Sequence, residues 1–160
     1  MSAIPQGYPV DANEAFDLLC SYDRLSVNDL KILSLIEQFG ESFYKGLASN
    51  LPSDETRALL ERNGQEERGH AHRLQKALRV KGEAFTLPAP EDNPFIHSSN
   101  AIAVDKAFLV MLAALERHGD DVYSKWASNE DNEEVATLLR LNAREETRHA
   151  ERIEQVISML

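Results

Sequence analysis

The segment Glu66-Glu67-Arg68-Gly69-His70 has the pattern Glu-Glu-x-x-His. The same pattern recurs later in the chain as Glu145-Glu146-Thr147-Arg148-His149. Each Glu-x-x-His motif also follows an earlier glutamate at the same interval. Glu37 lies thirty residues before Glu67, and Glu116 lies thirty residues before Glu146. This duplicated spacing decides the fold, because it predicts two equivalent units whose acidic and imidazole side chains can meet.

The agreement between the two halves extends beyond these motifs. At an offset of 79 residues, identical residues recur at Gly40/Gly119, Tyr44/Tyr123, Leu59-Leu60/Leu138-Leu139, Asn63/Asn142 and Arg73/Arg152. An internal repeat predicts that each half is one supersecondary unit, here a helical hairpin. An isolated hairpin would expose its apolar face, so we expect the two hairpins to pack into a four-helix bundle.

Helical periodicity and strong helix formers mark four long segments. We expect helices from about Val27 to Asn50, from about Asp54 to Val80, from about Ala101 to Ser128, and from the turn at Asn129 to Asn132 onward to the C-terminus. Ser26 and Asp29 form a capping-box pattern at the first start. A shorter helix is expected within residues 11–22.

A change of composition separates the two hairpins. Phe85 to Asn100 contains Pro88, Pro90 and Pro94, which predicts an extended connection. Sixteen extended residues reach roughly 50 Å, enough to cross a bundle of helices roughly 40 Å long. We therefore expect an N-terminal segment (1–25) and one bundle domain (26–160), divided into a first hairpin (26–82), a crossover (83–100) and a second hairpin (101–160).

The spacing of the motifs predicts a metal site at the middle of the bundle. The two side chains of a Glu-x-x-His motif lie on one helix face, a turn apart. Glu37 and Glu67 are equally distant from the turn at Pro52, so they reach the same height, and the second pair of glutamates is arranged in the same way about Asp131. The predicted ligands are Glu37, Glu67, His70, Glu116, Glu146 and His149.

Charge favours cations at this position. Four buried carboxylates without counter-ions would repel one another and would be costly to desolvate. Two divalent cations cancel their charge, and carboxylate and imidazole ligands suit iron or manganese, with zinc as an alternative occupant. Six ligands for two metals leave coordination positions open, whereas a structural zinc site is normally closed.

This pattern resembles the ferritin-like di-iron carboxylate superfamily over Ser26 to Leu160, and within it the rubrerythrin-type di-iron domain. The resemblance implies an all-α fold, a ferritin-like four-helix bundle of two helical hairpins joined by a long crossover connection. It implies two Fe ions bridged by Glu67 and Glu146. The resemblance also implies that the remaining ligands are terminal. Glu37 and His70 would bind one ion, and Glu116 and His149 would bind the other.

The tyrosines strengthen the resemblance. Tyr44 and Tyr123 each follow a ligand glutamate by seven residues, which places them on the ligand face. The resemblance implies that each phenol orients a glutamate of the opposite hairpin, or donates one electron. Packing as plain core aromatics is the alternative interpretation.

The sequence differs from rubrerythrin proper in two respects. The extra glutamate that follows the third-helix ligand by three residues in that family is replaced by Gly119. The rubredoxin module is missing, and the lone Cys20 cannot build its four-cysteine iron site, so electrons are expected from an external donor protein. Gly40 and Gly119 either leave space for a small oxidant or allow close helix packing.

Composition excludes several classes of partner. The 160 residues carry a formal net charge of −10 and a pI of about 4.9, which argues against nucleic acid and anionic membranes. No apolar run approaches a membrane span, and Met1 to Val10 has no signal-peptide pattern. We expect a cytoplasmic protein, and the resemblance implies a homodimer.

The predicted function is a di-metal carboxylate oxidoreductase that reacts with hydrogen peroxide or dioxygen. The alternatives are a ferroxidase that handles iron, a dimanganese protein with catalase-like chemistry, and a non-catalytic bundle in which the metals are structural or the protein is an interaction module. Other polar or aromatic residues have simpler interpretations. Glu66 and Glu145 are expected at the surface or in ion pairs, His72 and His118 at the surface, His97 without a role in the crossover, Trp126 in packing, and Cys20 as a small buried side chain.

Overall fold

The computed structural model describes residues 4–96 and 103–160 of the chain. Within these ranges all regular secondary structure is helical. The elements are α1 (Ala12–Cys20), α2 (Val27–Ser49), α3 (Asp54–Val80), the 3-10 turn η1 (Pro90–Asp92), α4 (Lys106–Asn129) and α5 (Glu133–Met159).

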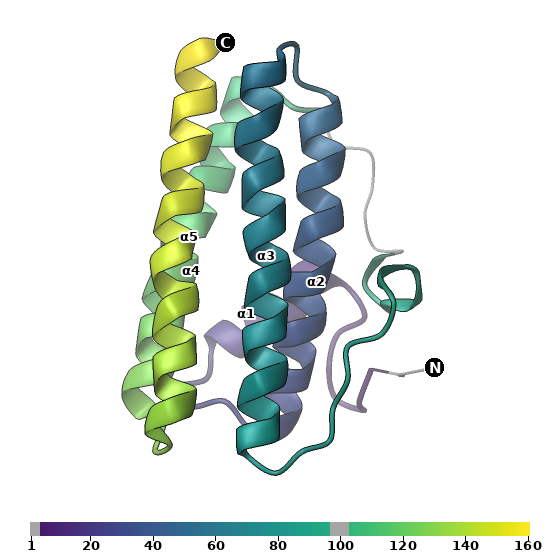
Figure 1. Ribbon diagram of the computed structural model, residues 1–160, viewed down its shortest axis with the longest axis vertical. Helices are drawn as coiled ribbons and strands as arrows, with labels where there is room; N and C mark the ends of the chain where they lie inside the picture. The colour runs from purple at the N-terminus through teal and green to yellow at the C-terminus, as the bar shows by residue number, and fades with distance from the viewer. Residues whose placement is uncertain (1–3, 97–102) are drawn as a thin grey trace.

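The long helices α2, α3, α4 and α5 form the bundle (Figure 1). Helices α2 and α3 pack as one antiparallel hairpin, α4 and α5 pack as the other, and α3 lies against α5 where the hairpins meet. The prediction of an all-α four-helix bundle is confirmed. The short helix α1 crosses one end of the bundle, within the range expected for it.

Helix boundaries follow local capping. Ser26 and Asp29 form the expected capping box at the start of α2, which satisfies amides that a helix start leaves unpaired. The third long helix begins at Lys106, later than the expected start at Ala101, because the Asp105 side chain accepts a hydrogen bond from the Phe108 amide and caps the helix there. Residues 97–102 lie outside the described part, and with them His97.

The crossover runs along the outer side of α2 (Figure 1). Three hydrogen bonds attach it to α2. Gln38 Nε2 donates to the Pro88 carbonyl at 2.7 Å, and Asn93 Nδ2 donates to the Leu35 carbonyl at 2.8 Å and to Gln38 Oε1 at 2.9 Å. Up to residue 96 it is non-helical apart from η1, as an extended connection requires, and η1 interrupts it with a single helical turn. Pro90 favours this turn because its fixed φ suits the first position of a helix.

Two apolar clusters fill the bundle, one toward each end. The first includes Leu33, Leu74, Leu78, Trp126 and Leu139, and the second includes Leu47, Leu60, Leu109, Ile153 and Val156. Each long helix contributes to both clusters, because its apolar face continues past the middle of the bundle. The polar residues buried between them are therefore shielded from solvent at both ends.

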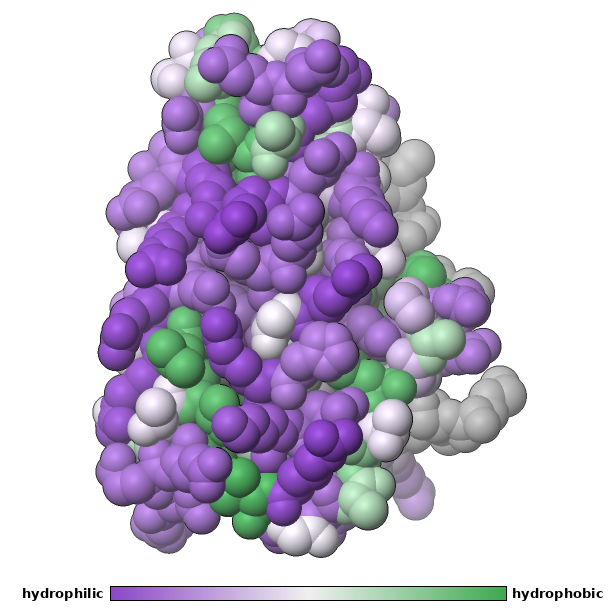
Figure 2. Space-filling model, viewed as in Figure 1, coloured by the Kyte–Doolittle hydropathy of each residue, from purple (hydrophilic) through white to green (hydrophobic). Residues whose placement is uncertain are grey.

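The outer surface is mainly polar. Figure 2 shows hydrophilic residues over most of the face formed by α3 and α5, with apolar residues scattered among them. In the described part of the chain, none of the helices combines the length and the hydropathy needed to cross a membrane.

Candidate metal centre

The structure brings all six predicted ligand residues together at the middle of the bundle. Two groups of four side chains have ligand atoms that all lie within 4.8 Å of one another. One group is Glu37, Glu67, His70 and Glu146, and the other is Glu67, Glu116, Glu146 and His149. Glu67 and Glu146 belong to both groups, so these two carboxylates lie between two adjoining positions.

The Nδ1 atoms of the histidines point toward the carboxylates. Nδ1 of His70 lies 3.2 Å from Glu67 Oε2, 3.5 Å from Glu146 Oε1 and 3.9 Å from Glu37 Oε1. Nδ1 of His149 lies 3.5 Å from Glu67 Oε1, 3.6 Å from Glu146 Oε2 and 3.8 Å from Glu116 Oε2. The two halves of the centre thus have closely similar geometry, as the sequence repeat requires.

The residues of this centre fit a pair of metal ions. Within the described residues, the buried side-chain atoms without a hydrogen-bond partner are Glu67 Oε2 and both ring nitrogens of His70 and of His149. Buried polar groups are normally hydrogen-bonded, and such exceptions call for a missing partner. A cation between Nδ1 and the carboxylates would supply that partner, and nitrogen and oxygen donors in this proportion suit iron or manganese.

Burial and mutual repulsion separate the pKa values of the carboxyl groups. Burial, together with the charges of Glu67 and Glu146, raises the pKa of Glu37 well above its usual value. Burial and the charge of Glu146 raise the pKa of Glu116 to about 8. Burial opposes ionisation of Glu67 as well, but contacts with His149 and His70 outweigh it and lower the pKa of Glu67 to about 2.

The pKa values of Glu146, the other shared carboxyl group, and of the two histidines are also shifted. Burial and the charge of Glu67 oppose ionisation of Glu146, but the close approach of Glu116 and of the two histidines lowers its pKa to about 2. Burial disfavours the charged form of His70 and His149, yet the surrounding carboxylates raise the pKa of both rings well above the usual value. Without metal, protons on four side chains therefore supply the positive charge that two divalent ions would bring.

Tyr44 and Tyr123 each contact the first ligand glutamate of the opposite hairpin. Tyr44 of α2 donates its phenolic hydrogen to Glu116 Oε1 of α4, and Tyr123 of α4 donates to Glu37 Oε1 of α2. Burial and the nearby carboxylates raise the pKa of both phenols well above the usual value, so they remain protonated donors. The contacts are reciprocal across the hairpins, the geometry that the family resemblance implies.

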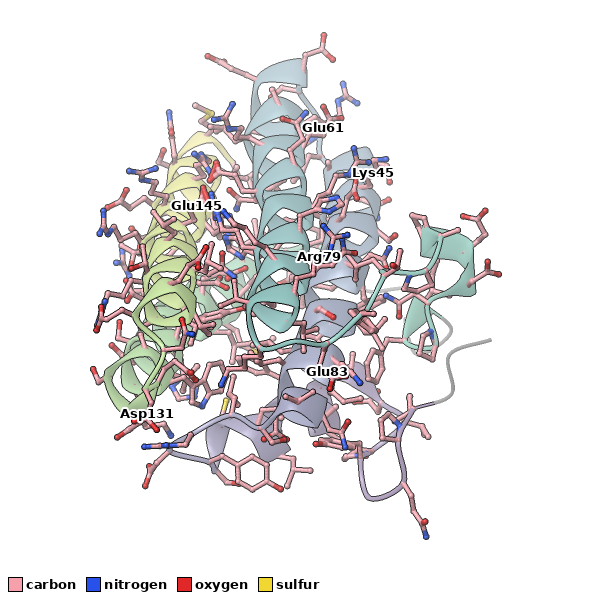
Figure 3. All side chains as sticks on the ribbon, turned by 60° about the horizontal axis from the view of Figure 1, so that its bottom comes forward. Lys45, Glu61, Arg79, Glu83, Asp131 and Glu145 are labelled. Atoms are coloured by element: carbon pink, nitrogen blue, oxygen red, sulfur yellow. The ribbon has the colours of Figure 1, made fainter. Side chains whose placement is uncertain are left out.

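Glu66 and Glu145 belong to the centre rather than to the outer surface. Glu145, labelled in Figure 3, pairs with Arg73 of α3 and lies 3.4 Å from Nε2 of His70. Glu66 pairs with Arg152 at 2.9 Å and lies 3.7 Å from Nε2 of His149. The expectation of surface or ion-pair residues is met by the ion pairs, and packing of α3 against α5 leaves both side chains only partly exposed.

Two asparagines connect these ion pairs to the backbone behind the histidines. Asn63 donates to the His149 carbonyl and accepts from Arg152, while Asn142 donates to the His70 carbonyl and accepts from Arg73. Carboxylates and carbonyls around a ligand histidine orient its ring and tune its basicity. Sequence reasoning assigned no role to these residues, although their identity in both copies was the available signal.

The two glycines beside the first glutamates of the repeat make room for the shared carboxylates. A Cβ atom at Gly40 would lie 3.2 Å from Cδ of Glu67, and one at Gly119 would lie 3.2 Å from Cδ of Glu146. These are tighter than ordinary contacts. Close packing of α2 on α3 and of α4 on α5 is therefore the interpretation that the structure supports.

The remaining single residues differ in their environment. His72 and His118 are exposed, as expected, and Trp126 is buried, as expected for a packing residue. Cys20 is half-buried rather than fully enclosed, and burial raises the pKa of its thiol to about 11.

Comparison with known proteins agrees with this architecture. A family model described as a ferritin-like domain matches residues 26–159, which run from the capping residue of α2 to the end of α5. No curated protein and no solved structure matches the chain. The matched region contains both hairpins and all six clustered residues. By this match, the chain belongs to the family of ferritin-like domains.

Proposed function

We propose that this protein is a di-iron oxidoreductase of rubrerythrin-like type, which reduces hydrogen peroxide or dioxygen. The observation that supports it best is the pair of overlapping ligand groups, in which Glu67 and Glu146 are shared and the imidazole Nδ1 atoms lack other partners. A structural site would have little need of two adjoining ions with incomplete protein coordination.

The six side chains would divide the binding between them. Glu37 and His70 would hold one ion, Glu116 and His149 would hold the other, and the two shared carboxylates would contact both. When bound as a ferrous pair, iron would supply the two electrons needed to reduce one peroxide molecule to water. Because Gly119 provides no seventh ligand, the protein donors remain these six.

The surrounding residues keep the ligands in place. The phenol of Tyr44 fixes one oxygen of Glu116, and the phenol of Tyr123 fixes one oxygen of Glu37. Glu145 and Glu66 lie against the outer nitrogens of the histidines, which favours the tautomer that leaves Nδ1 free for metal. The apolar clusters on both sides exclude water and strengthen each of these electrostatic contacts.

The test is rapid mixing of the anaerobic ferrous protein with hydrogen peroxide and, separately, with dioxygen. We expect a fast rise in ferric absorbance with at least one oxidant. The Glu67→Ala/Glu146→Ala double variant should lose it, whereas Glu61→Gln, at an exposed position of α3, should retain it. If neither oxidant gives a fast ferric signal, the proposal is wrong.

Two further measurements separate the alternatives. Light scattering with iron analysis distinguishes a monomer or dimer that retains two irons from a ferroxidase shell that stores many. Anomalous X-ray scattering at the iron and manganese edges, on protein from its native host, identifies the resident metal. Manganese in both positions would favour the catalase-like alternative. The homodimer and the external electron donor are part of the same proposal.

A further inference from the structure

A pair of buried aromatic rings leads away from the metal centre. The ring centroids of Tyr123 and Trp126 lie 5.3 Å apart in an edge-on arrangement, with an interplanar angle of 78°. At its inner end, Tyr123 hydrogen-bonds to Glu37 and lies edge-on to the His70 ring at 6.3 Å. Both aromatic side chains are almost completely buried. Two oxidisable rings are thus in contact, and one of them touches two predicted ligands.

The outer end of this pair reaches the loop after α1. The Trp126 indole donates its Nε1 hydrogen to the Tyr22 carbonyl at 2.9 Å, and the Phe16 ring of α1 packs edge-on against the indole at 6.3 Å. Trp126 itself is 1% exposed, whereas Tyr22 is 37% exposed and lines a surface hollow of about 410 Å³. One residue therefore separates the indole from the molecular surface.

The other half of the repeat has no equivalent pair. Tyr44 makes the corresponding contact with Glu116, but the aromatic ring beside it is Phe43, at 5.8 Å. The repeat position of Trp126 is Leu47, which is equally well buried. Phenyl and aliphatic groups do not lose an electron under conditions that oxidise an indole. A leucine fills the equivalent position in the other half, so the repeat by itself does not require a tryptophan here.

We propose that Trp126 and Tyr123 form a one-electron path from the surface beside Tyr22 to the metal centre. The inference rests on the proposed function, because a di-iron centre that reduces peroxide must recover its electrons from a donor. The external one-electron donor protein that the proposed function requires would bind at the end of the bundle that α1 covers.

The electron and proton of each step balance within these residues. Tyr123 gives one electron to the oxidised centre while its phenolic proton moves along the existing hydrogen bond to Glu37 Oε1. Trp126 then gives an electron to the tyrosyl radical, and the proton returns to the phenol oxygen. The indole radical cation keeps its Nε1 hydrogen, held by the Tyr22 carbonyl, until the donor protein reduces it.

The path can be tested without iron or peroxide. The full-length chain, with redox-inert zinc added, is oxidised by a flash-generated ruthenium(III) complex, and the radicals are followed by transient absorption. Trp126 is the only tryptophan in the sequence, so the indole radical has a single source. This experiment runs the exchange between Trp126 and Tyr123 in reverse, with the electron passing from the phenol to the indole radical. We expect the indole radical to decay until it is in equilibrium with a tyrosyl radical, and Tyr123→Phe to lose that transfer.

The repeat offers a matched control. Tyr44→Phe removes the equivalent phenol on the side without a tryptophan, so it should keep the transfer, and circular dichroism should show both variants folded. An indole radical with the same lifetime in Tyr123→Phe as in the unaltered chain would overturn the proposal and leave Trp126 as a packing residue. Because zinc replaces iron, this result is independent of whether the protein reacts with peroxide.

Discussion

Replacing Gly119 with alanine tests whether the bundle is built around the shared carboxylate of Glu146. The added Cβ would lie 3.2 Å from Cδ of Glu146 and 3.4 Å from its Cγ and Oε2. Gly46 provides a matched control, because it is also inside a long helix but a Cβ there would meet no atom within 4 Å. Both substitutions remove the same backbone freedom, so their difference isolates the contact with Glu146.

In Gly119→Ala, the gain from removing a flexible glycine and the cost of overpacking against Glu146 have opposite signs and comparable sizes. Glycine in a helix interior costs roughly 0.5–1 kcal/mol relative to alanine, so Gly46→Ala should stabilise the fold by about that amount. Gly119→Ala gains the same amount but overpacks a filled site, which typically costs about 1–3 kcal/mol. Its net effect should lie between about zero and about 2.5 kcal/mol of destabilisation. Displacement of Glu146 should also weaken metal binding. We expect roughly 10- to 100-fold, the loss typical when a residue that supports a metal ligand is mutated.

Urea unfolding of the metal-free proteins measures the change in folding stability, and calorimetric titration with zinc or ferrous iron measures the change in metal affinity. We expect Gly46→Ala to bind metal as the unaltered protein does. If Gly119→Ala binds metal as tightly as Gly46→Ala and is stabilised equally, then Gly119 does not make room for the carboxylate and the argument from close packing fails.

Four further predictions concern the ligands and their supports. Glu145→Ala should weaken metal binding in calorimetry by roughly 10- to 100-fold, whereas Glu154→Ala, in an exposed pair with Arg117, should not. Because four groups have raised pKa values, among them Glu116 at about 8, metal loading at neutral pH should release protons, seen as a buffer-dependent binding heat. The same groups bind protons more tightly in the folded state, so metal-free stability should fall as pH rises from about 5 to 8, while the melting-temperature gain from metal should increase. Tyr44→Phe leaves a Glu116 oxygen without its donor and should cost about 1–3 kcal/mol in urea unfolding of the metal-free protein.

The balance of charge explains why the centre favours metal over protons. Without metal, neutrality requires protons on both imidazoles, whose rings stack at 5.2 Å with an interplanar angle of 18°. Two like charges so close and so deeply buried repel each other. Divalent ions remove this repulsion and also give the Nδ1 atoms a partner. Metal binding and folding should therefore stabilise each other.

Much of the architecture could be predicted from residue spacing. Helical periodicity and capping residues are local properties, and they predicted α2 and α3 closely. The duplicated interval between Glu37 and Glu67 predicted that six polar side chains would meet at one height, because helix rise and turn position are set by the chain itself. The late start of α4 was missed, since the strength of Asp105 as a cap depends on its own backbone conformation.

The sequence by itself determined which side chains share a helix face and how far each lies from a turn, because both follow from regular helix geometry. Only the tertiary structure decided what surrounds them. Glu145 lies about 100° around its helix from the ligand face, which left a surface position or an ion pair open. Packing of α3 against α5 places it beside His70 and Arg73. Gly119 and Trp126 acquire their meaning in the same way, from atoms of Glu146 and Tyr123 that packing brings next to them.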